Sequence, residues 1–409
     1  MPFALYMLGL AVFAMGTSEF MLSGLIPDIA HDLHVTVPAA GSLTSAFAVG
    51  MVIGAPLMAV IGMRWSRRAA LLLFLVVFLA AHAMGALTDS FDVLLMTRVL
   101  SALANAGFLA VSFTAAAGMV PPNAKGRAAA VLLGGVTLAC VAGVPGGALL
   151  GQYWGWRSAF WAVVVLSAPA VLAVALTVPA GRGDGPAPTL RDVRAELGVL
   201  RRRRPLLLLA LCALVNGGTF CTFTYLAPLV TGVSGIPDGW VPGVLTLFGL
   251  GSFAGVSAAG RLADTRPVAL LAWGTAVHAV GWAVFALGAG SPEVVLPLVL
   301  LQGALAFAIG STLVTQVLYA GADAPTLAGA GATAAFNVGA SLGPWLGGVA
   351  IAAGHGYRSP VWVSAGLVSA ALVTGAVALA AGRRGRRADD RPREVGEAGR
   401  EAGEAAPAG

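Results

Sequence analysis

The chain has 409 residues, of which 58% are hydrophobic and only 10% are charged, and its formal net charge is +6. Soluble domains carry roughly 25% charged residues, so this composition excludes a soluble protein and predicts an integral, multi-pass protein of the cell membrane. The basic excess lies in short loops beside apolar runs, where the positive-inside rule accounts for it. We therefore expect no nucleic-acid partner.

Apolar runs long enough to cross about 30 Å of hydrocarbon recur along the whole chain. The first half predicts helices at residues 3–26, 41–62, 69–88, 92–119, 128–151 and 158–178. The second half predicts helices at residues 206–230, 241–262, 268–289, 293–319, 328–352 and 361–381. The predicted fold is therefore an all-α membrane protein with twelve transmembrane helices.

Charged residues between the predicted helices indicate the orientation. One set of loops carries the basic residues Arg64, Arg67, Arg68, Lys125, Arg127, Arg201, Arg202, Arg203, Arg204, Arg261 and Arg266. The opposite set carries mainly the acidic residues Asp28, Asp32, Asp89, Asp92, Asp238 and Glu293. Because Lys and Arg are enriched in cytoplasmic loops, both termini are predicted to be cytoplasmic.

The chain divides into four predicted parts. Residues 1–178 and 205–381 each hold six helices. Between them, residues 179–204 form a cytoplasmic linker that is rich in glycine and proline at its start and in arginine at its end. Residues 382–409 lack apolar periodicity, which predicts a disordered cytoplasmic tail.

The two halves repeat each other at a constant offset. Residues 155–158 (Gly-Trp-Arg-Ser) return as residues 356–359 (Gly-Tyr-Arg-Ser), 201 positions later, and the same offset places Pro27 on Pro228. This period is too long for a solenoid unit of about 20–50 residues, so we expect a duplicated six-helix half. Two embedded halves in tandem are typical of transporters that rock around a site between them.

Glu19 lies well inside the first predicted helix. An acidic group at that depth costs on the order of 3 kcal/mol to insert, so it is expected to face a cavity or a polar partner. This makes Glu19 a candidate for reversible proton binding. The alternative is a buried glutamate that bridges helices.

Arg98 lies about two turns into the fourth predicted helix. It shares one helical face with Ser101, Asn105 and Ser112, at spacings of three, seven and fourteen residues. A polar stripe of this kind is expected to face the interior of the bundle. The alternative for Arg98 is a side chain that snorkels to the membrane surface.

Residues 260–264 (Gly-Arg-Leu-Ala-Asp) resemble the loop signature G-x-L-a-D of the major facilitator superfamily, specifically of its drug/proton antiporter branch. The resemblance implies a gating role for Arg261 and Asp264. The first-half counterpart departs from the signature, with Ala59 in place of glycine and Met63 in place of aspartate. This departure argues against a charge-relay gate in the first-half loop and leaves the fold assignment intact.

Two predicted helices combine glycine and proline in a way that is similar to the flexing helices of exporters in this family. The fifth carries Gly143, Pro145 and Gly147, and the eleventh carries Gly343 and Pro344. Small residues let helix backbones approach closely, and proline loosens a local turn. We expect gating or structural roles for these residues, with plain helix packing as the alternative.

Residues 15–20 and 24–30, together with Arg98, resemble the actinobacterial chloramphenicol-resistance exporters, and the resemblance extends over essentially the whole chain. It implies proton-coupled efflux of a small antibiotic, most of all chloramphenicol, with Glu19 and Arg98 coupling the proton. The expected ligands are a small-molecule drug and a proton, within a lipid bilayer. We expect a monomer with no cofactor and no metal site.

The side chains expected to line the substrate cavity are acidic, amide or aromatic. They are Glu19, Phe20, Asn105, Asn216, Phe220, Phe223 and Asn337. For any single amide, a hydrogen bond between helices is the alternative role. His82 and His278 are interpreted as hydrogen-bonded histidines of helix packing, with a proton relay as the alternative.

Drug export has three alternatives. An exporter of an endogenous sugar, nucleoside or amino acid would share the fold, although a sugar site would present more hydrogen-bonding side chains. A membrane-embedded enzyme or sensor is the remote alternative, since no nucleophile–base set or metal cluster is visible, and we predict that the chain is not an enzyme. An ATP-driven pump would need the phosphate loop G-x-x-x-x-G-K-[ST], which the chain lacks.

Overall fold

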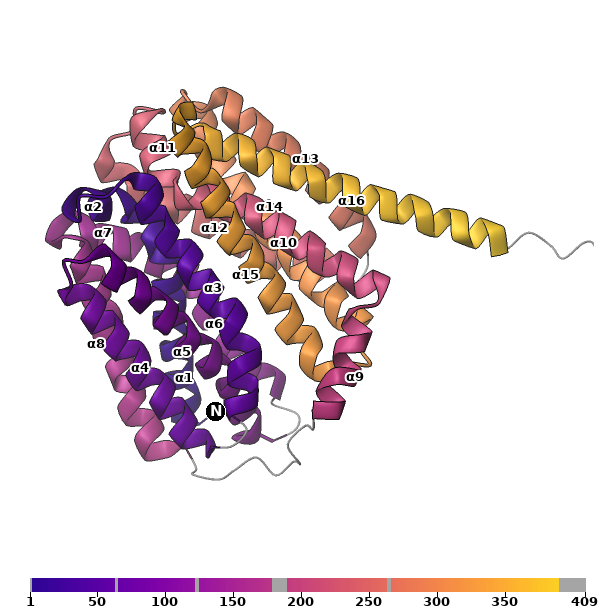
Figure 1. Cartoon of the computed structure of the whole chain (residues 1–409), viewed down its shortest axis with the longest axis horizontal. Helices are drawn as coiled ribbons and strands as arrows, with labels where there is room; N and C mark the ends of the chain where they lie inside the picture. The colour runs from indigo at the N-terminus through magenta and orange to yellow at the C-terminus, as the bar shows by residue number, and fades with distance from the viewer. Residues whose placement is uncertain (1, 63–64, 122–124, 179–189, 263–265, 390–409) are drawn as a thin grey trace, which may run out of the picture.

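The computed structural model describes residues 2–62, 65–121, 125–178, 190–262 and 266–389 (Figure 1). Within these ranges the chain is almost entirely helical, and twelve helical segments are long and apolar enough to cross a membrane. The predicted fold class, an all-α protein with twelve transmembrane helices, is confirmed.

The N-terminal half is built from eight helices that form six spans. They are α1 (Phe3–Phe20), α2 (Ile26–Asp32), α3 (Val37–Gly62), α4 (Arg67–Leu87), α5 (Phe91–Gly118), α6 (Lys125–Leu138), α7 (Val144–Trp154) and α8 (Trp156–Thr177). After the linker helix α9 (Leu190–Leu200), the C-terminal half follows the same plan. Its helices are α10 (Arg203–Thr224), α11 (Leu226–Gly232), α12 (Val241–Leu262), α13 (Pro267–Gly288), α14 (Pro292–Ala320), α15 (Pro325–Ala350) and α16 (Ser359–Asp389).

Two of the predicted spans in the N-terminal half are interrupted. The first ends as α1 and passes through a 3-10 turn, Met21–Gly24, into α2. The fifth consists of α6 and α7, joined by a π-helical turn at Ala139–Gly143. A proline stands at the second position of the helix after each break, Pro27 in α2 and Pro145 in α7. Proline lacks a backbone N–H and crowds the preceding turn, which favours a break before these positions. Proline alone does not decide the break, since Pro169, Pro297 and Pro344 lie inside continuous helices.

Each half has its own hydrophobic core. In the N-terminal half the largest buried rings are those of Phe74, Phe78, Phe108, Trp156 and Phe160. The C-terminal half contains two buried clusters. One of them also includes the N-terminal residues Ala48, Val144 and Ala148. These three residues mark where the halves pack together.

The two halves meet at one end of the molecule and diverge toward the other. Figure 1 shows α3 and α15 close together near α2 and α11, and separated near α9 and the N-terminus. Ser45 Oγ of α3 donates a hydrogen bond to the carbonyl oxygen of Ser341 in α15 at 2.8 Å. Gln152 Nε2 of α7 donates to the carbonyl oxygen of Asp238 at 2.5 Å. Since Asp238 belongs to the acidic set of loops, the closed end is the predicted outer side.

The linker helix α9 packs on the C-terminal half, at the start of α15. Glu196 Oε2 accepts a hydrogen bond of 2.8 Å from the backbone N–H of Leu327, which lies in the first turn of α15. Arg202 and Asp323 form an ion pair of 3.2 Å beside it. The described part of the linker is therefore attached to the C-terminal half, whose first helix, α10, begins two residues before the predicted boundary at 205.

The last helix is longer than predicted. α16 runs to Asp389, eight residues beyond the predicted end of the span at 381. The added segment, residues 382–389, contains four arginines, which favour helix, and two glycines, which do not. The start of the proposed tail at 382 therefore falls within a helix, and residues 390–409 lie outside the described chain.

Candidate functional site

Glu19 is the penultimate residue of α1, just before the chain turns through Met21–Gly24. Consecutive side chains of a helix point about 100° apart. Ser18 is fully buried inside the N-terminal half and Phe20 contacts Phe220 of the C-terminal half, so Glu19 projects between these two directions. Its side chain is partly exposed and forms no hydrogen bond or ion pair with any residue in the described chain.

Arg98 of α5 is fully buried, so it does not snorkel to the surface. Its Nη1 donates to Ser18 Oγ at 2.9 Å and its Nη2 donates to the carbonyl oxygen of Ser18 at 2.8 Å. The guanidinium carbon lies 4.5 Å from the centre of the Phe47 ring, a cation–π contact. Arg98 and Glu19 interact electrostatically without touching. The structure therefore brings the two predicted proton-coupling residues into one site.

Ser18 and His82 are members of this site that the sequence did not identify. Ser18 Oγ lies 2.6 Å from His82 Nε2, and His82 Nδ1 lies 2.8 Å from the carbonyl oxygen of Phe78. His82 is a hydrogen-bonded histidine, as predicted, but its partner also binds Arg98. The only signal in the sequence was the position of Ser18 directly before Glu19, which does not reveal a contact 64 residues away.

An unbroken series of aromatic rings connects the two halves beside Glu19. Phe20 and Phe220 have ring centres 5.7 Å apart, and Phe220 lies 6.0 Å from Phe223. Phe223 continues to Phe248 at 4.4 Å, and Phe248 to Phe307 at 6.3 Å. The structure thus brings Phe20, Phe220 and Phe223 together, but Phe220 and Phe223 are buried in the core of the C-terminal half. Phe248 and Phe307 extend this aromatic cluster into α12 and α14.

The three predicted asparagines differ in their bonding. Asn216 donates through Nδ2 to the carbonyl oxygen of Phe336 at 2.7 Å and so ties α10 to α15. Asn337 donates to the carbonyl oxygen of Thr333 within its own helix at 3.0 Å. Asn105 is buried, and its Oδ1 has no hydrogen-bond partner in the described part of the chain. Of the three, Asn105 is the one whose unpaired acceptor is buried.

The predicted gating residues of the fifth span pack against α1. A Cβ added at Gly143 would collide with Thr17 Oγ, and one added at Gly147 would lie 3.1 Å from Met21 Cβ. Gly143 ends the π-helical turn, and Pro145 follows it. The flexible part of this span therefore lies directly against the end of α1 that carries Glu19.

In the eleventh span, Gly343 and Pro344 hold α15 against α10. A Cβ on Gly343 would collide with the backbone oxygen of Gly217, and Tyr225 donates its hydroxyl to the carbonyl oxygen of Pro344 at 2.9 Å. These contacts are close helix packing. The side chain of Arg261 and the whole of Asp264 lie outside the described residues.

A cavity of about 770 Å³ opens between the halves at the predicted outer end. Its lining includes Asp28 from the N-terminal half and Asp238 from the C-terminal half. Burial raises the pKa of Asp28, and the nearby Asp238 raises it further. The cavity thus places two aspartates from opposite halves within electrostatic range.

The pKa of Asp32, one turn after Asp28, is shifted in the opposite direction. Trp156 Nε1 donates to Asp32 Oδ2 at 2.9 Å, and Arg157 forms an ion pair with the same oxygen. These hydrogen bonds, that of Trp156 first, lower the pKa of Asp32. Arg157 also pairs with Asp89 at 2.7 Å. The repeated Trp-Arg element therefore joins α2, α8 and the loop between α4 and α5.

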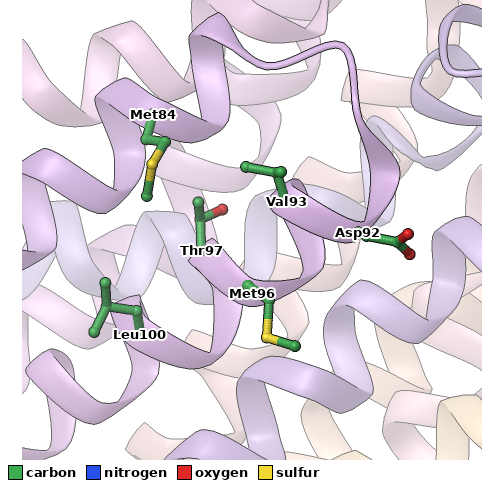
Figure 2. Close-up of a pocket in the computed structure, with 6 residues that line it drawn as sticks. All are labelled: Met84, Asp92, Val93, Met96, Thr97 and Leu100. Carbon is green, nitrogen blue, oxygen red and sulfur yellow. The ribbon is translucent and has the colours of Figure 1, made fainter.

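A second hollow, of about 260 Å³, lies apart from this site on α4 and α5 (Figure 2). It is lined by Met84, Asp92, Val93, Met96, Thr97 and Leu100. Met84 and Met96 are 47% and 68% exposed, as expected for side chains that face lipid. Figure 2 shows the Asp92 carboxylate pointing away from the methionines. This groove is on the outside of the bundle and is separate from Glu19.

Known proteins resemble the chain over nearly its whole length. The family model described as the Major Facilitator Superfamily matches residues 8–330. A chloramphenicol resistance protein of Streptomyces lividans is 54% identical over 373 residues, which cover 91% of this chain and 95% of that protein. The inner membrane transport protein YdhP of Escherichia coli is 33% identical over 357 residues, covering 87% of this chain and 90% of that protein.

Solved structures confirm the fold. The nucleoside transporter NupG superposes with a TM-score of 0.74 at 13% identity, covering 92% of this chain and 99% of its own. A bacterial homologue of the human lysosomal transporter Spinster, in an inward-facing and unoccupied conformation, gives a TM-score of 0.67 at 18% identity, with 92% and 94% covered. The chain therefore belongs to the major facilitator superfamily and is a multi-pass membrane transporter, not an enzyme.

Proposed function

We propose that the chain exports a small antibiotic, chloramphenicol before others, in exchange for protons and by alternating access. The observation that carries this proposal is the partial exposure of Glu19 and its lack of a hydrogen-bond or ion-pair partner in the described chain. Glu19 is the acidic residue at membrane depth, it is partly exposed, and it has no bonded partner among the described residues. A structural carboxylate at that depth would be held by hydrogen bonds or a touching cation, because a buried unpaired charge is costly.

The surroundings of Glu19 suit a small, largely uncharged drug. The partly exposed ring of Phe20, which contacts the buried rings of Phe220 and Phe223, can stack on an aromatic ligand. Asn105 adds a free acceptor on the side of the N-terminal half. Small-molecule sites commonly combine apolar walls with a few fixed polar groups in this way. The resistance protein at 54% identity supports chloramphenicol as the first drug to test.

The proposed cycle depends on competition between drug and proton. With the outer end closed, Glu19 releases its proton to the inside and the drug binds next to the ionised carboxylate. The halves then rock so that the site opens outward, and a proton from outside neutralises Glu19 and displaces the drug. The neutral site returns to the inward-open state. A ligand shifts such an equilibrium only through its different affinities for the two states, so the negative charge must change drug affinity.

Arg98 has a defined part in this cycle. Its guanidinium supplies a permanent positive charge that interacts with Glu19 but does not touch it. This charge keeps the ionised carboxylate tolerable inside the protein, and its separation leaves room for a proton to enter. A direct ion pair would hold the carboxylate charged and block the exchange.

The test is drug accumulation in inside-out vesicles under an imposed pH gradient. We expect Glu19→Gln to abolish gradient-driven chloramphenicol accumulation, because the amide cannot exchange a proton. Glu293→Gln, which changes an exposed glutamate in the first turn of α14, is the matched control and should accumulate drug like the wild type. Undiminished accumulation by Glu19→Gln would remove Glu19 from the mechanism.

The choice of substrate needs a separate test. Cells that express the chain are compared with cells that express Glu19→Gln on a panel of antibiotics, with and without a proton uncoupler. We expect resistance to chloramphenicol that the uncoupler removes. Unchanged susceptibility across the panel would favour export of an endogenous sugar, nucleoside or amino acid instead.

A further inference from the structure

The hydrogen bonds around Ser18 fix the direction of every donor. The carbonyl oxygen of Phe78 can only accept, so His82 Nδ1, 2.8 Å away, carries the hydrogen. A neutral ring then accepts at Nε2, and the hydroxyl of Ser18, 2.6 Å away, must donate to it. This leaves the lone pairs of Ser18 Oγ for the N–H of Arg98 Nη1 at 2.9 Å. The order of donation is Arg98 to Ser18 to His82 to Phe78.

Thr17 shows what a hydroxyl does on this helix without such a partner. Its Oγ donates to the carbonyl oxygen of Phe13, four residues earlier, at 2.8 Å. This local bond is the usual choice for serine and threonine within helices. His82 therefore draws the Ser18 hydroxyl away from its own helix and aims its acceptor lone pairs at Arg98.

The position of Arg98 depends on Ser18. The side chain is fully buried, and its hydrogen bonds within the described chain go to Ser18 Oγ and to the Ser18 carbonyl oxygen. Phe47 covers the guanidinium, and Nε has no partner in the described residues. The bonds to Ser18 thus hold the cation away from the carboxylate of the next residue, Glu19.

We propose that His82 is a positioning residue for proton exchange: through the Ser18 hydroxyl it holds Arg98 at a fixed distance from Glu19. This inference rests on the proposed function of Glu19. The charged or titratable groups around the pair are Arg98 of α5, His82 of α4 and Cys140 of the π-helical turn. When the hydroxyl anchor is lost, Arg98 keeps its bond to the Ser18 carbonyl oxygen, but its Nη1 is free to turn toward the carboxylate, and closer contact favours the ionised form. Protonation of Glu19 then requires a lower pH.

The variants distinguish the loss of the hydrogen bond between Ser18 and His82 from a change in the packing of the His82 ring. His82→Phe keeps a ring between Phe78 and Phe160, whose centres lie 4.1 Å and 5.7 Å from the imidazole, but removes both nitrogens. Ser18→Ala removes this bond and also the bond that Arg98 Nη1 donates to the hydroxyl. His82→Gln restores an acceptor for the hydroxyl. His278→Phe is the matched control, since His278 is equally buried but bonds to Gln302 and Trp282 in the other half.

The measurement is an infrared titration of the protonated carboxyl band of Glu19 in purified protein, assigned by its loss in Glu19→Gln. We expect His82→Phe and Ser18→Ala to lower the midpoint by about one pH unit, a tenfold change in proton affinity. The double variant should shift no further than Ser18→Ala, because Ser18→Ala already removes the bond between Ser18 and His82. His82→Gln and His278→Phe should titrate like the wild type.

Two results would overturn the inference. One is a wild-type midpoint in both His82→Phe and Ser18→Ala, and the other is an equal shift in His278→Phe. If His82→Phe fails to fold, the titration midpoints of Ser18→Ala and His82→Gln are compared instead. A lowered midpoint in Ser18→Ala alone supports the inference, and equal midpoints contradict it. The proposed function fails in a different way, when the wild-type protein shows no titrating Glu19 band or no gradient-driven transport.

Discussion

The two halves use buried polar side chains in different ways, although they repeat each other. In the N-terminal half a cation, Arg98, is bound to Ser18 and interacts with an unpaired carboxylate. The position 201 residues later, in α14, is Val299. The polar cluster of the C-terminal half consists of neutral groups that bind each other: His278 Nδ1 lies 3.2 Å from Gln302 Oε1, and Trp282 donates to His278 Nε2 at 3.2 Å.

Unpaired polar atoms show the same contrast. Six buried side-chain atoms lack a hydrogen-bond partner in the described chain, and five of them belong to the N-terminal half. These five are Thr44 Oγ, Arg98 Nε, Asn105 Oδ1, Ser112 Oγ and Ser167 Oγ. Since nearly all buried polar groups in proteins are paired, the exceptions mark where a ligand or a proton is expected. In the described chain, unpaired buried polar atoms are therefore concentrated in the N-terminal half, which also holds Glu19 and Arg98.

The largest effect on transport is expected when the two residues at matched positions of the repeat, Arg98 and Val299, are each replaced by methionine. Arg98→Met removes the cation that balances Glu19, whereas Val299→Met changes only packing in the other half. We expect gradient-driven export to fall about 100-fold in Arg98→Met, a loss of roughly 2.7 kcal/mol. Val299→Met should keep most of the activity. Equal losses in vesicle uptake assays would show that the halves do not divide the work as described.

Substituting one glycine in each half compares the two halves by their effect on the free energy of unfolding. A Cβ at Gly343 meets the backbone of Gly217, which is fixed by two packed helices, while a Cβ at Gly143 meets only the side chain of Thr17, whose Cβ would lie 2.9 Å away. We expect Gly343→Ala to lower the free energy of unfolding by about 3 kcal/mol and Gly143→Ala by about 1 kcal/mol. Gly143→Ala should instead slow transport. Thermal unfolding and initial uptake rates measure the two effects, and the reverse ranking would contradict the assignment.

The aromatic contact between the halves is expected to act on affinity. Phe20→Ala removes the ring that meets Phe220 at 5.7 Å, so drug should bind about tenfold more weakly, a loss of roughly 1.4 kcal/mol. Phe253→Ala is the matched control, since Phe253 is 55% exposed on the lipid face of α12. Equilibrium binding of labelled drug measures both. A normal affinity in Phe20→Ala would place the drug elsewhere.

The smallest effect is expected at the outer end. Hydrogen bonds from Trp156 and Arg157 lower the pKa of Asp32, so the ionised carboxylate stabilises the folded state above the ordinary aspartate range. That stability is lost as the pH falls through the lowered pKa. Because Asp32 is 45% exposed, the contribution is about 1 kcal/mol or less. Asp32→Asn should flatten the fall in melting temperature below about pH 4, whereas Asp92→Asn should not.

The sequence predicted the fold and part of the site, including Glu19 and Arg98. The same physical reasons explain why other site residues could not be predicted. Long apolar runs can only be membrane helices, so the twelve spans were predictable. Glu19 and Arg98 stood out because charges at membrane depth are costly. Ser18 did not, and His82 was assigned mainly to helix packing, since their contact depends on how α1, α4 and α5 assemble. The break in α1 at Met21–Gly24 was missed because hydropathy does not register a turn within an apolar run.

Proton release on drug binding tests the central claim most directly. Drug is added to lightly buffered purified protein, and the change in pH is recorded. If drug and proton compete at Glu19, the wild type and Glu293→Gln will release protons and Glu19→Gln will release none. Equal release by Glu19→Gln and the wild type would contradict the account.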